Sequence, residues 1–189
     1  ICKIGKIEIN DGFYDLETAY GYGGYFVNTD DKDFLFNAFE FYKKRCKDEK
    51  IIAEFIRFHP FISFPKEHKE FLNMNILDRD VVCVDLSLSK DARWQNYSTN
   101  TRNILRKCQK ELVFRKSENL EKFIELYIKT MNKNSASEFY YFNKRYFETM
   151  INLENVELYE VLKDEEVISS AFFIFGEEIG HYHLSANDY

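Results

Sequence analysis

The chain has 189 residues, of which 45% are hydrophobic, and its formal net charge is −6. This length suits one large domain or two small ones with a substantial core. The negative charge disfavours binding to DNA, because non-specific affinity for nucleic acids depends on clustered Lys and Arg. No run approaches the roughly 20 apolar residues of a membrane span. The start does not have the pattern of a signal peptide, so we expect a cytoplasmic protein without a membrane span.

The cysteines indicate neither a zinc site nor a redox motif. Cys2, Cys46, Cys83 and Cys108 lie far apart, with no Cys-x-x-Cys pair among them, so we expect buried free thiols. The sequence does not begin with Met and ends directly after a strand-like run, so we expect it to be part of a longer chain.

In the first half, alternation of apolar and polar residues predicts a strand over residues 1–9. A helix is expected over residues 31–48. Its apolar side is predicted to comprise Phe34, Ala38, Phe41, Tyr42 and Arg45, flanked by Leu35, Phe39 and Cys46. Runs of β-branched and aromatic residues predict two further strands, over residues 51–61 and 81–88.

The second half predicts one or two helices within residues 89–112, then a short strand over 112–117. A helix over 118–133 follows, with Ser117 as its N-cap and one apolar face that comprises Leu120, Phe123, Ile124, Tyr127, Ile128 and Met131. Another helix is expected over 144–153, and three strands joined by hairpin-like connections over 156–162, 167–175 and 179–185. This order predicts an α+β fold of two half-related modules, with a seam within residues 87–111.

The strongest charge feature lies between Arg93 and Lys116, where seven basic residues and one acidic residue give +6, against −12 for the rest of the chain. Such a segment can bind a phosphorylated ligand, since Arg offers a fork of donors and Lys a point charge. The alternative is a solvated helix face paired with acidic neighbours.

The stretch ETAYGYGGY, residues 17–25, combines closely spaced glycines and tyrosines. Its spacing fits neither a Walker loop nor the G-x-G-x-x-G dinucleotide motif. Glycines nevertheless permit positive φ and close approach of the backbone, and the aromatic rings between them suit the wall of a cleft. The alternative is a glycine-supported turn with buried tyrosines. The residues concerned are Tyr20, Gly21, Tyr22, Gly23, Gly24 and Tyr25.

Two pairs of residues at i, i+2 spacing are candidates for proton transfer or ligand binding. In the predicted strand 51–61, Arg57 and His59 point to the same side, where Arg57 suits an anion and His59 a proton near neutral pH. The alternative for His59 is a histidine held at the end of a strand.

His181 and His183 likewise share a face of the last strand, opposite Tyr182 and Leu184. A zinc site here requires a third ligand, from Glu177, Glu178 or Asp188. A metal-dependent hydrolase is therefore the weakest of the functions considered, and we expect no metal.

Four motifs come in an order that resembles the FemAB-like acyltransferases, a branch of the GNAT superfamily with two tandem GNAT-like modules. The motifs are DLETAYGYGGY, AEFIRFHPF, VVCVDLS followed by TRNILRKCQKE, and GHYHLSAND. The resemblance spans nearly the whole chain. It implies a first module over residues 1–88, a basic connecting helix region over 89–111 and a second, incomplete module over 112–189, each with a mainly antiparallel mixed sheet flanked by helices.

The resemblance implies transfer of an acyl or aminoacyl group from acyl-CoA, such as acetyl-CoA, or from aminoacyl-tRNA to an amine. The acceptor is a small-molecule or nucleotide-linked precursor of the cell envelope or of surface polysaccharide. Residues carried over as edges of an acceptor cleft between the modules are Tyr20, Gly21, Tyr22, Gly23, Gly24, Arg57, His59, Arg102 and Arg106. Tyr182 and His183 belong to a strand expected at the centre of the second module, near the acyl-transfer region.

One element of the resemblance is not found within the sequence. GNAT domains bind acyl-CoA through an Arg/Gln-x-x-Gly-x-Gly/Ala loop at the start of a helix, which is expected after the last strand. The donor, the catalytic base and the oligomeric state therefore stay open. The rival hypothesis is a non-catalytic binding or scaffold module with the same fold.

Overall fold

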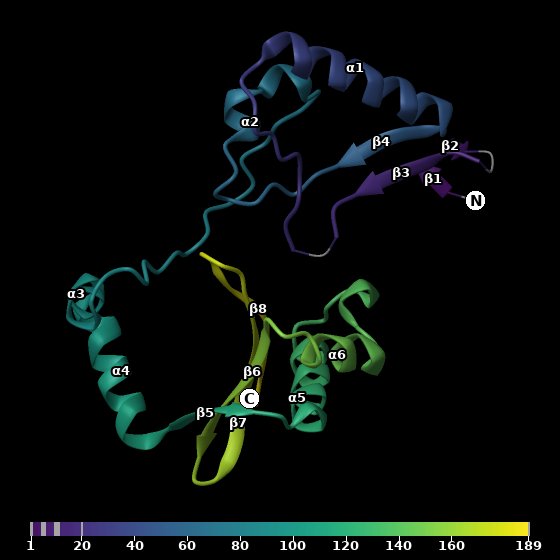
Figure 1. The fold of residues 1–189 in the computed structure, drawn as a ribbon. Coiled ribbons are helices and arrows are strands. Elements are labelled where there is room, and N and C mark those ends of the chain that lie inside the picture. Colours follow the sequence, from purple (N-terminus) through teal and green to yellow (C-terminus); the bar gives the residue numbers. More distant parts are fainter. Residues whose placement is uncertain (1, 5–6, 10–11, 20, 189) are drawn as a thin grey trace. The chain divides into compact units, whose positions relative to one another are not determined.

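The computed structural model describes residues 2–4, 7–9, 12–19 and 21–188, and the chain divides into two compact units. Unit 1 comprises residues 1–83 and unit 2 residues 84–189. Both contain helices and strands, so the fold is α+β, as predicted (Figure 1). The basic helical region, expected to connect two modules, belongs to unit 2.

Unit 1 contains two separate two-stranded sheets. Strands β1 (Cys2–Ile4) and β2 (Ile7–Ile9) form an antiparallel pair where one strand was predicted. Strand β3 (Tyr14–Glu17) pairs in parallel with β4 (Ile51–Phe55), and helix α1 (Lys32–Asp48) makes the crossover that a parallel pair requires. In the described residues, unit 1 thus lacks the mainly antiparallel mixed sheet that was expected.

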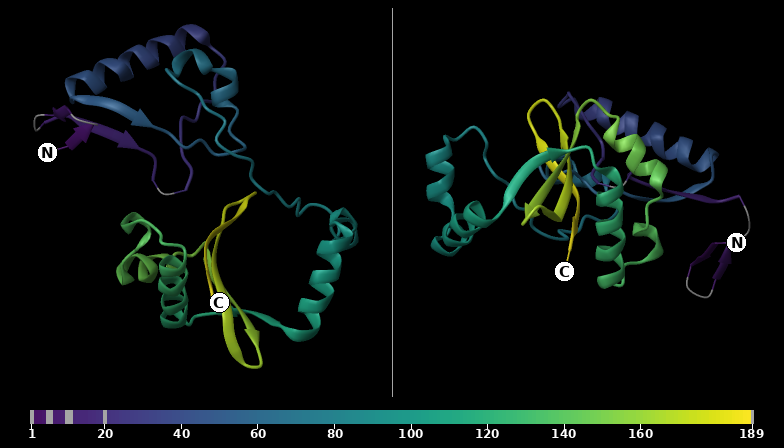
Figure 2. Two further views of the ribbon diagram at one scale, coloured as in Figure 1. Left: turned by 180° about the vertical axis from the view of Figure 1, so that it is seen from behind. Right: turned by 90° about the horizontal axis from the view of Figure 1, so that it is seen from below.

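The core of unit 1 is aromatic and lies beside α1, which runs alongside β4 (Figure 2). Leu35 and Phe39 of α1 are buried, together with Phe64 of the short helix α2 (Phe64–Glu67). The centre of the predicted apolar face of α1 was wrong, because Phe34 and Phe41 are 59% and 72% exposed, whereas the buried Leu35 and Phe39 belong to its predicted flank. The 3₁₀ helix η1 (Lys69–Phe71) adds Phe71, whose ring stacks on Phe39 at 4.4 Å.

The strand predicted over residues 81–88 is also wrong, because residues 81–85 form neither helix nor strand and residues 86 and 87 lie in a turn. Val82 is 97% exposed and Leu86 67%. A β-prone run forms a strand only where a neighbouring strand satisfies its backbone groups. The predicted strand over 51–61 likewise ends early, at Phe55. The predicted burial of cysteines fails at Cys83, which is exposed, whereas Cys46 and Cys108 are partly exposed.

Unit 2 begins with two helices, α3 (Lys90–Asn96) and α4 (Thr99–Glu111), and continues with strand β5 (Val113–Ser117). Helix α5 (Leu120–Lys133), the 3₁₀ helix η2 (Glu138–Tyr140) and helix α6 (Lys144–Ile151) follow. The chain then forms strands β6 (Val156–Lys163), β7 (Glu166–Phe175) and β8 (Gly180–Asn187). The strands form one antiparallel sheet in the order β5-β6-β7-β8, which confirms the predicted hairpins.

Helices α5 and α6 lie on one face of this sheet and form the core of unit 2 with it (Figure 1). Phe123 of α5, Phe147 of α6 and Phe172 of β7 are at most 1% exposed and contact one another through their rings. Asn119 caps α5 by accepting a hydrogen bond from the Lys122 N–H, so the prediction of Ser117 as N-cap was wrong.

Candidate functional site

The glycine stretch packs closely against the chain that follows β4. The Gly23 N–H donates to the Arg57 carbonyl at 2.9 Å, and Gly23 forms a parallel bridge with Phe58. Gly24 has φ +122°, and a Cβ on it would lie 2.5 Å from the Phe58 ring. A Cβ on Gly23 would lie 2.9 Å from the Thr18 methyl group. These two glycines thus permit close packing within unit 1, whereas Tyr20 lies outside the described residues.

Tyr25 belongs to the aromatic core of unit 1. Its ring contacts Phe39 and Phe64 with centroids 5.1 Å and 5.3 Å apart, and its hydroxyl donates to the Glu54 carboxylate. Burial and the hydrogen bond to Glu54 both raise the pKa of Tyr25. Burial and Glu54 raise the pKa of Tyr42 in the same way. The arrangement at Tyr25 matches the alternative of a turn with buried tyrosines.

His59 holds a turn. Its Nδ1 accepts a hydrogen bond from the Phe61 N–H at 3.2 Å, and its carbonyl accepts from the Ile62 N–H at 3.0 Å. An accepting Nδ1 leaves the proton of the neutral ring on Nε2. The Tyr22 ring lies against the His59 ring, edge to face, at 5.4 Å.

Arg57 follows the end of β4 and is exposed. The pKa of the exposed Asp78 carboxyl is lowered mainly by Arg79, with a further contribution from the Arg57 charge. The structure thus brings the Gly23 backbone beside the Arg57 backbone, and the Tyr22 ring beside the His59 ring.

Arg93 of α3 and Arg102 of α4 each donate hydrogen bonds to two backbone carbonyls that precede their helix. Arg93 Nη1 donates to the carbonyls of Leu86 and Leu88, seven and five residues earlier. Arg102 Nη1 donates to the carbonyls of Gln95 and Tyr97, again seven and five residues earlier. In each case the serine four residues before the arginine caps the helix; these caps are Ser89 and Ser98.

Arg106, one turn further along α4, contacts side chains. It donates to the Asn103 amide oxygen at 2.9 Å, and its guanidinium lies 5.4 Å from the centre of the Trp94 ring. The Arg102 guanidinium thus binds backbone carbonyls of the preceding residues. The Arg106 guanidinium, by contrast, connects α4 to Trp94 of α3. Arg106, Lys107 and Lys110 are exposed, whereas Arg102 is half-buried.

The pair of side chains in unit 2 with the clearest capacity for proton transfer is Tyr146 and His183. The Tyr146 hydroxyl oxygen and His183 Nε2 lie 2.8 Å apart and share a hydrogen bond. Tyr146 comes from α6 and His183 from β8, and both side chains are partly exposed. Phe142 stacks on the Tyr146 ring at 4.4 Å and so orients it.

A bulge in β8 orients His183. Phe172 pairs with Leu184 and Phe173 with Tyr182, so that His183 is the extra residue. Leu184 is 6% exposed in the core, whereas Tyr182 is 57% exposed, which corrects the expectation that they share a face. Burial, and then the neighbouring His181, lower the pKa of His183 below its usual value. Burial therefore favours the neutral imidazole of His183 over its protonated form.

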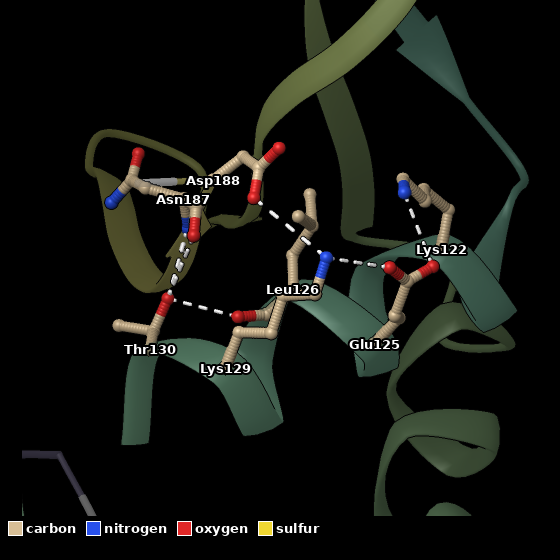
Figure 3. Close-up of polar contacts among 7 residues, drawn as sticks. All are labelled: Lys122, Glu125, Leu126, Lys129, Thr130, Asn187 and Asp188. Atoms are coloured by element: carbon tan, nitrogen blue, oxygen red, sulfur yellow. Dashed lines mark hydrogen bonds and ion pairs between the residues drawn. The ribbon is translucent and has the colours of Figure 1, made fainter. Parts of the chain in front are cut away.

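The end of β8 is attached to α5 by polar contacts (Figure 3). The Asn187 N–H donates to the Thr130 hydroxyl at 3.0 Å, and that hydroxyl donates to the Leu126 carbonyl at 2.9 Å. The Lys129 ammonium lies 2.9 Å from Glu125 and 3.7 Å from Asp188. These contacts fix the strand that carries His183. Within the described sheet, β8 is an edge strand.

Two further properties bear on the functions considered. Among the residues that the structure describes, no group of three or more His, Cys, Asp or Glu is placed to hold a metal ion. Within the same ranges, every helix is too short or too polar to cross a bilayer.

Sequence reasoning missed Tyr146, because nothing in its local pattern distinguishes it from a core aromatic residue. It also missed the hydrogen bonds from Arg93 and Arg102 to the carbonyls before α3 and α4. A sequence signal for them exists, because Ser-x-x-x-Arg occurs twice, nine residues apart. The predicted site residues fall into two sets, with Gly21 to Gly24, Arg57 and His59 in unit 1 and Arg102, Arg106, Tyr182 and His183 in unit 2. Neither a scan against protein-family models nor a search of curated proteins finds a match for this chain.

Proposed function

We propose that the protein is a FemAB-like N-acyltransferase, which transfers an acyl or aminoacyl group from a carrier to an amine. The observation that carries the proposal is the topology of unit 2, in which one strand and two helices precede three antiparallel strands in the order β5-β6-β7-β8. This arrangement suits the part of a GNAT-like module that comes before the acyl-CoA loop.

The chemistry requires direct attack of an amine on a thioester or ester, with a group that takes the proton from the nitrogen. No covalent intermediate on the protein is needed. His183, whose neutral form burial favours and which is hydrogen-bonded to Tyr146, is a base of the required kind. The phosphates of a carrier would meet Lys107 and Lys110, since the Arg102 guanidinium already binds carbonyls of its own chain.

The donor is either acyl-CoA or aminoacyl-tRNA. The acceptor is an amine on a cell-envelope or surface-polysaccharide precursor. The alternative, a binding or scaffold module without turnover, predicts affinity for a phosphorylated ligand and no transfer.

The test is a transfer assay with the purified chain. Acetyl-CoA or a mixture of aminoacyl-tRNAs is incubated with a panel of amino sugars and amino acids, and products are identified by mass spectrometry. We expect an amide product whose amount grows with protein concentration and which heat-unfolded protein does not form. Binding of CoA or tRNA in calorimetry without any amide product would favour the scaffold alternative instead.

A further inference from the structure

Tyr146 and His183 are brought together by two independent features of unit 2. They are 37 residues apart in sequence, and only the packing of α6 near β8 places the hydroxyl 2.8 Å from Nε2. The bulge in β8, opposite Phe172 and Phe173, puts His183 out of step with the regular alternation of the strand, and its ring faces this helix. Bulges of this kind often redirect a side chain beside an active site.

The chemistry of the two groups decides the direction of the hydrogen bond. A phenol O–H is a better donor than an imidazole N–H, and a bare imidazole nitrogen is a better acceptor than a phenol oxygen. With Tyr146 as the donor to Nε2, the ring proton of a neutral His183 is on Nδ1. His183 faces Tyr146 of α6 and His181 of its own strand, while its β7 neighbours are Phe172 and Phe173.

We propose that Tyr146 and His183 form a proton relay for the attacking amine, an inference that rests on the proposed acyltransferase function. As the amine nitrogen bonds to the acyl carbon, its proton passes to the Tyr146 oxygen while the Tyr146 proton passes to His183 Nε2. The carbon–sulfur or carbon–oxygen bond to the carrier then breaks. The leaving thiolate or alkoxide recovers the proton along the same path, so that the products are an amide and the protonated carrier.

The surroundings of the pair fit this role. Both side chains are half-buried, so the pair is partly shielded from water without being closed off from the surface. Phe142 fixes the Tyr146 ring on one side. On β8 the neighbouring Tyr182 is 57% exposed, on the face opposite the core.

The first test compares Tyr146→Phe and His183→Gln in the transfer assay across pH 5 to 9. We expect each to lower kcat by about 10²-fold, the usual contribution of a positioned proton acceptor, and the double variant to lose no more than either single one. The decline of the wild-type rate at acidic pH should disappear in His183→Gln. Tyr141→Phe is the matched control, because it removes the hydrogen bond to Asn132 and leaves the pair intact; its rate should equal that of the wild type.

The second test is independent of activity. Nitrogen-15 NMR of the histidines should show His183 protonated on Nδ1 at pH 7 and titrating below the ordinary value, and Tyr146→Phe should change its Nε2 resonance. A His183 protonated on Nε2, or one that Tyr146→Phe leaves unchanged, overturns the relay.

The two tests separate the possible failures. If the wild type transfers acyl groups and both variants keep its rate and pH profile, the relay is overturned and the proposed function stands. If the wild type transfers nothing from either donor, the proposed function fails and the relay fails with it, even where the NMR spectra show the hydrogen-bonded pair.

Discussion

Partial burial beside a second imidazole determines the protonation of His183. Its pKa is lowered in the folded chain, chiefly by burial and also by His181, whereas the unfolded chain has the ordinary value of about 6.5. Between these two values the unfolded chain binds more protons than the folded chain. The contribution of His183 to the free energy of unfolding is therefore fully present above about pH 6.5. It is lost as the pH falls through the lowered pKa of the folded chain.

We expect unit 2 to be less stable at pH 5.5 than at pH 7.5, and the difference to shrink in His183→Gln. The measurement is the free energy of opening of α5 and β7 from hydrogen exchange at the two pH values. A pH dependence that His183→Gln leaves unchanged would assign the effect to other groups.

Gly24 shows how a single missing side chain permits close packing. Gly24→Ala places a methyl group 2.5 Å from the Phe58 ring and imposes φ +122° on a residue with a Cβ. Gly21→Ala is the matched control, with φ +116° but no atom within 4 Å of the added Cβ. Backbone strain is common to both, at roughly 1–2 kcal/mol.

We therefore expect Gly24→Ala to destabilise α1 and β4 more than Gly21→Ala, by a further 1–3 kcal/mol or so from overpacking. Hydrogen exchange of α1 amides reports the difference. Equal effects of the two substitutions would show that the Phe58 contact does not constrain the stretch. By the same reasoning, we expect Gly23→Val to lower stability, because its Cβ would lie 2.9 Å from the Thr18 methyl group.

At the scale of elements, Thr130 joins a helix to a strand. Its hydroxyl is buried and contacts the Leu126 carbonyl and the backbone of Asn187 (Figure 3). Thr130→Val keeps the shape and leaves the Asn187 N–H without its acceptor, which costs about 1–3 kcal/mol. We expect faster hydrogen exchange at Asn187.

The control is Thr149→Val on α6. Thr149 is exposed and makes only an intrahelical bond to the Arg145 carbonyl, so its loss should have little effect. If both substitutions lower the free energy of unfolding equally, the attachment of β8 to α5 does not depend on Thr130.

Arg102 has a structural role in the start of α4. Arg102→Ala removes the donor to the carbonyls of Gln95 and Tyr97, and hydrogen bonds from a charged donor are worth roughly 1.5–3 kcal/mol. Arg106→Ala removes only contacts with Asn103 and Trp94. We expect circular dichroism to show loss of helix for Arg102→Ala, and Trp94 fluorescence to change for Arg106→Ala without such loss. The reverse pattern would return Arg102 to the group of ligand-binding candidates.

At the scale of the whole molecule, prediction from sequence succeeded where local pattern and packing agree. Strand β6 alternates between buried and half-buried residues, and β-prone runs separated by short polar connections mark the three strands after residue 155, so their approximate bounds and hairpins were predictable. On α5, Phe123 and Tyr127 were correctly placed in the core, whereas Ile128 is 46% exposed and the buried Leu126 was missed.

The failures have physical causes. Helix α1 is apolar on several sides, so periodicity alone does not select Leu35 and Phe39 over Phe34 and Phe41. The β-prone residues 81–88 depend on a partner strand, which a local pattern does not reveal. The pairing of Tyr146 with His183 depends on a bulge in β8 and on contacts between elements far apart in the chain. No local sequence pattern predicts either feature.

The decisive measurement is the rate of acyl transfer from acetyl-CoA or aminoacyl-tRNA to an amine, compared between the wild type and His183→Gln at pH 7.5. We expect an amide product from the wild type and a rate about 10²-fold lower from the variant, with both proteins equally folded by circular dichroism. No amide from the folded wild type with either donor would contradict this expectation.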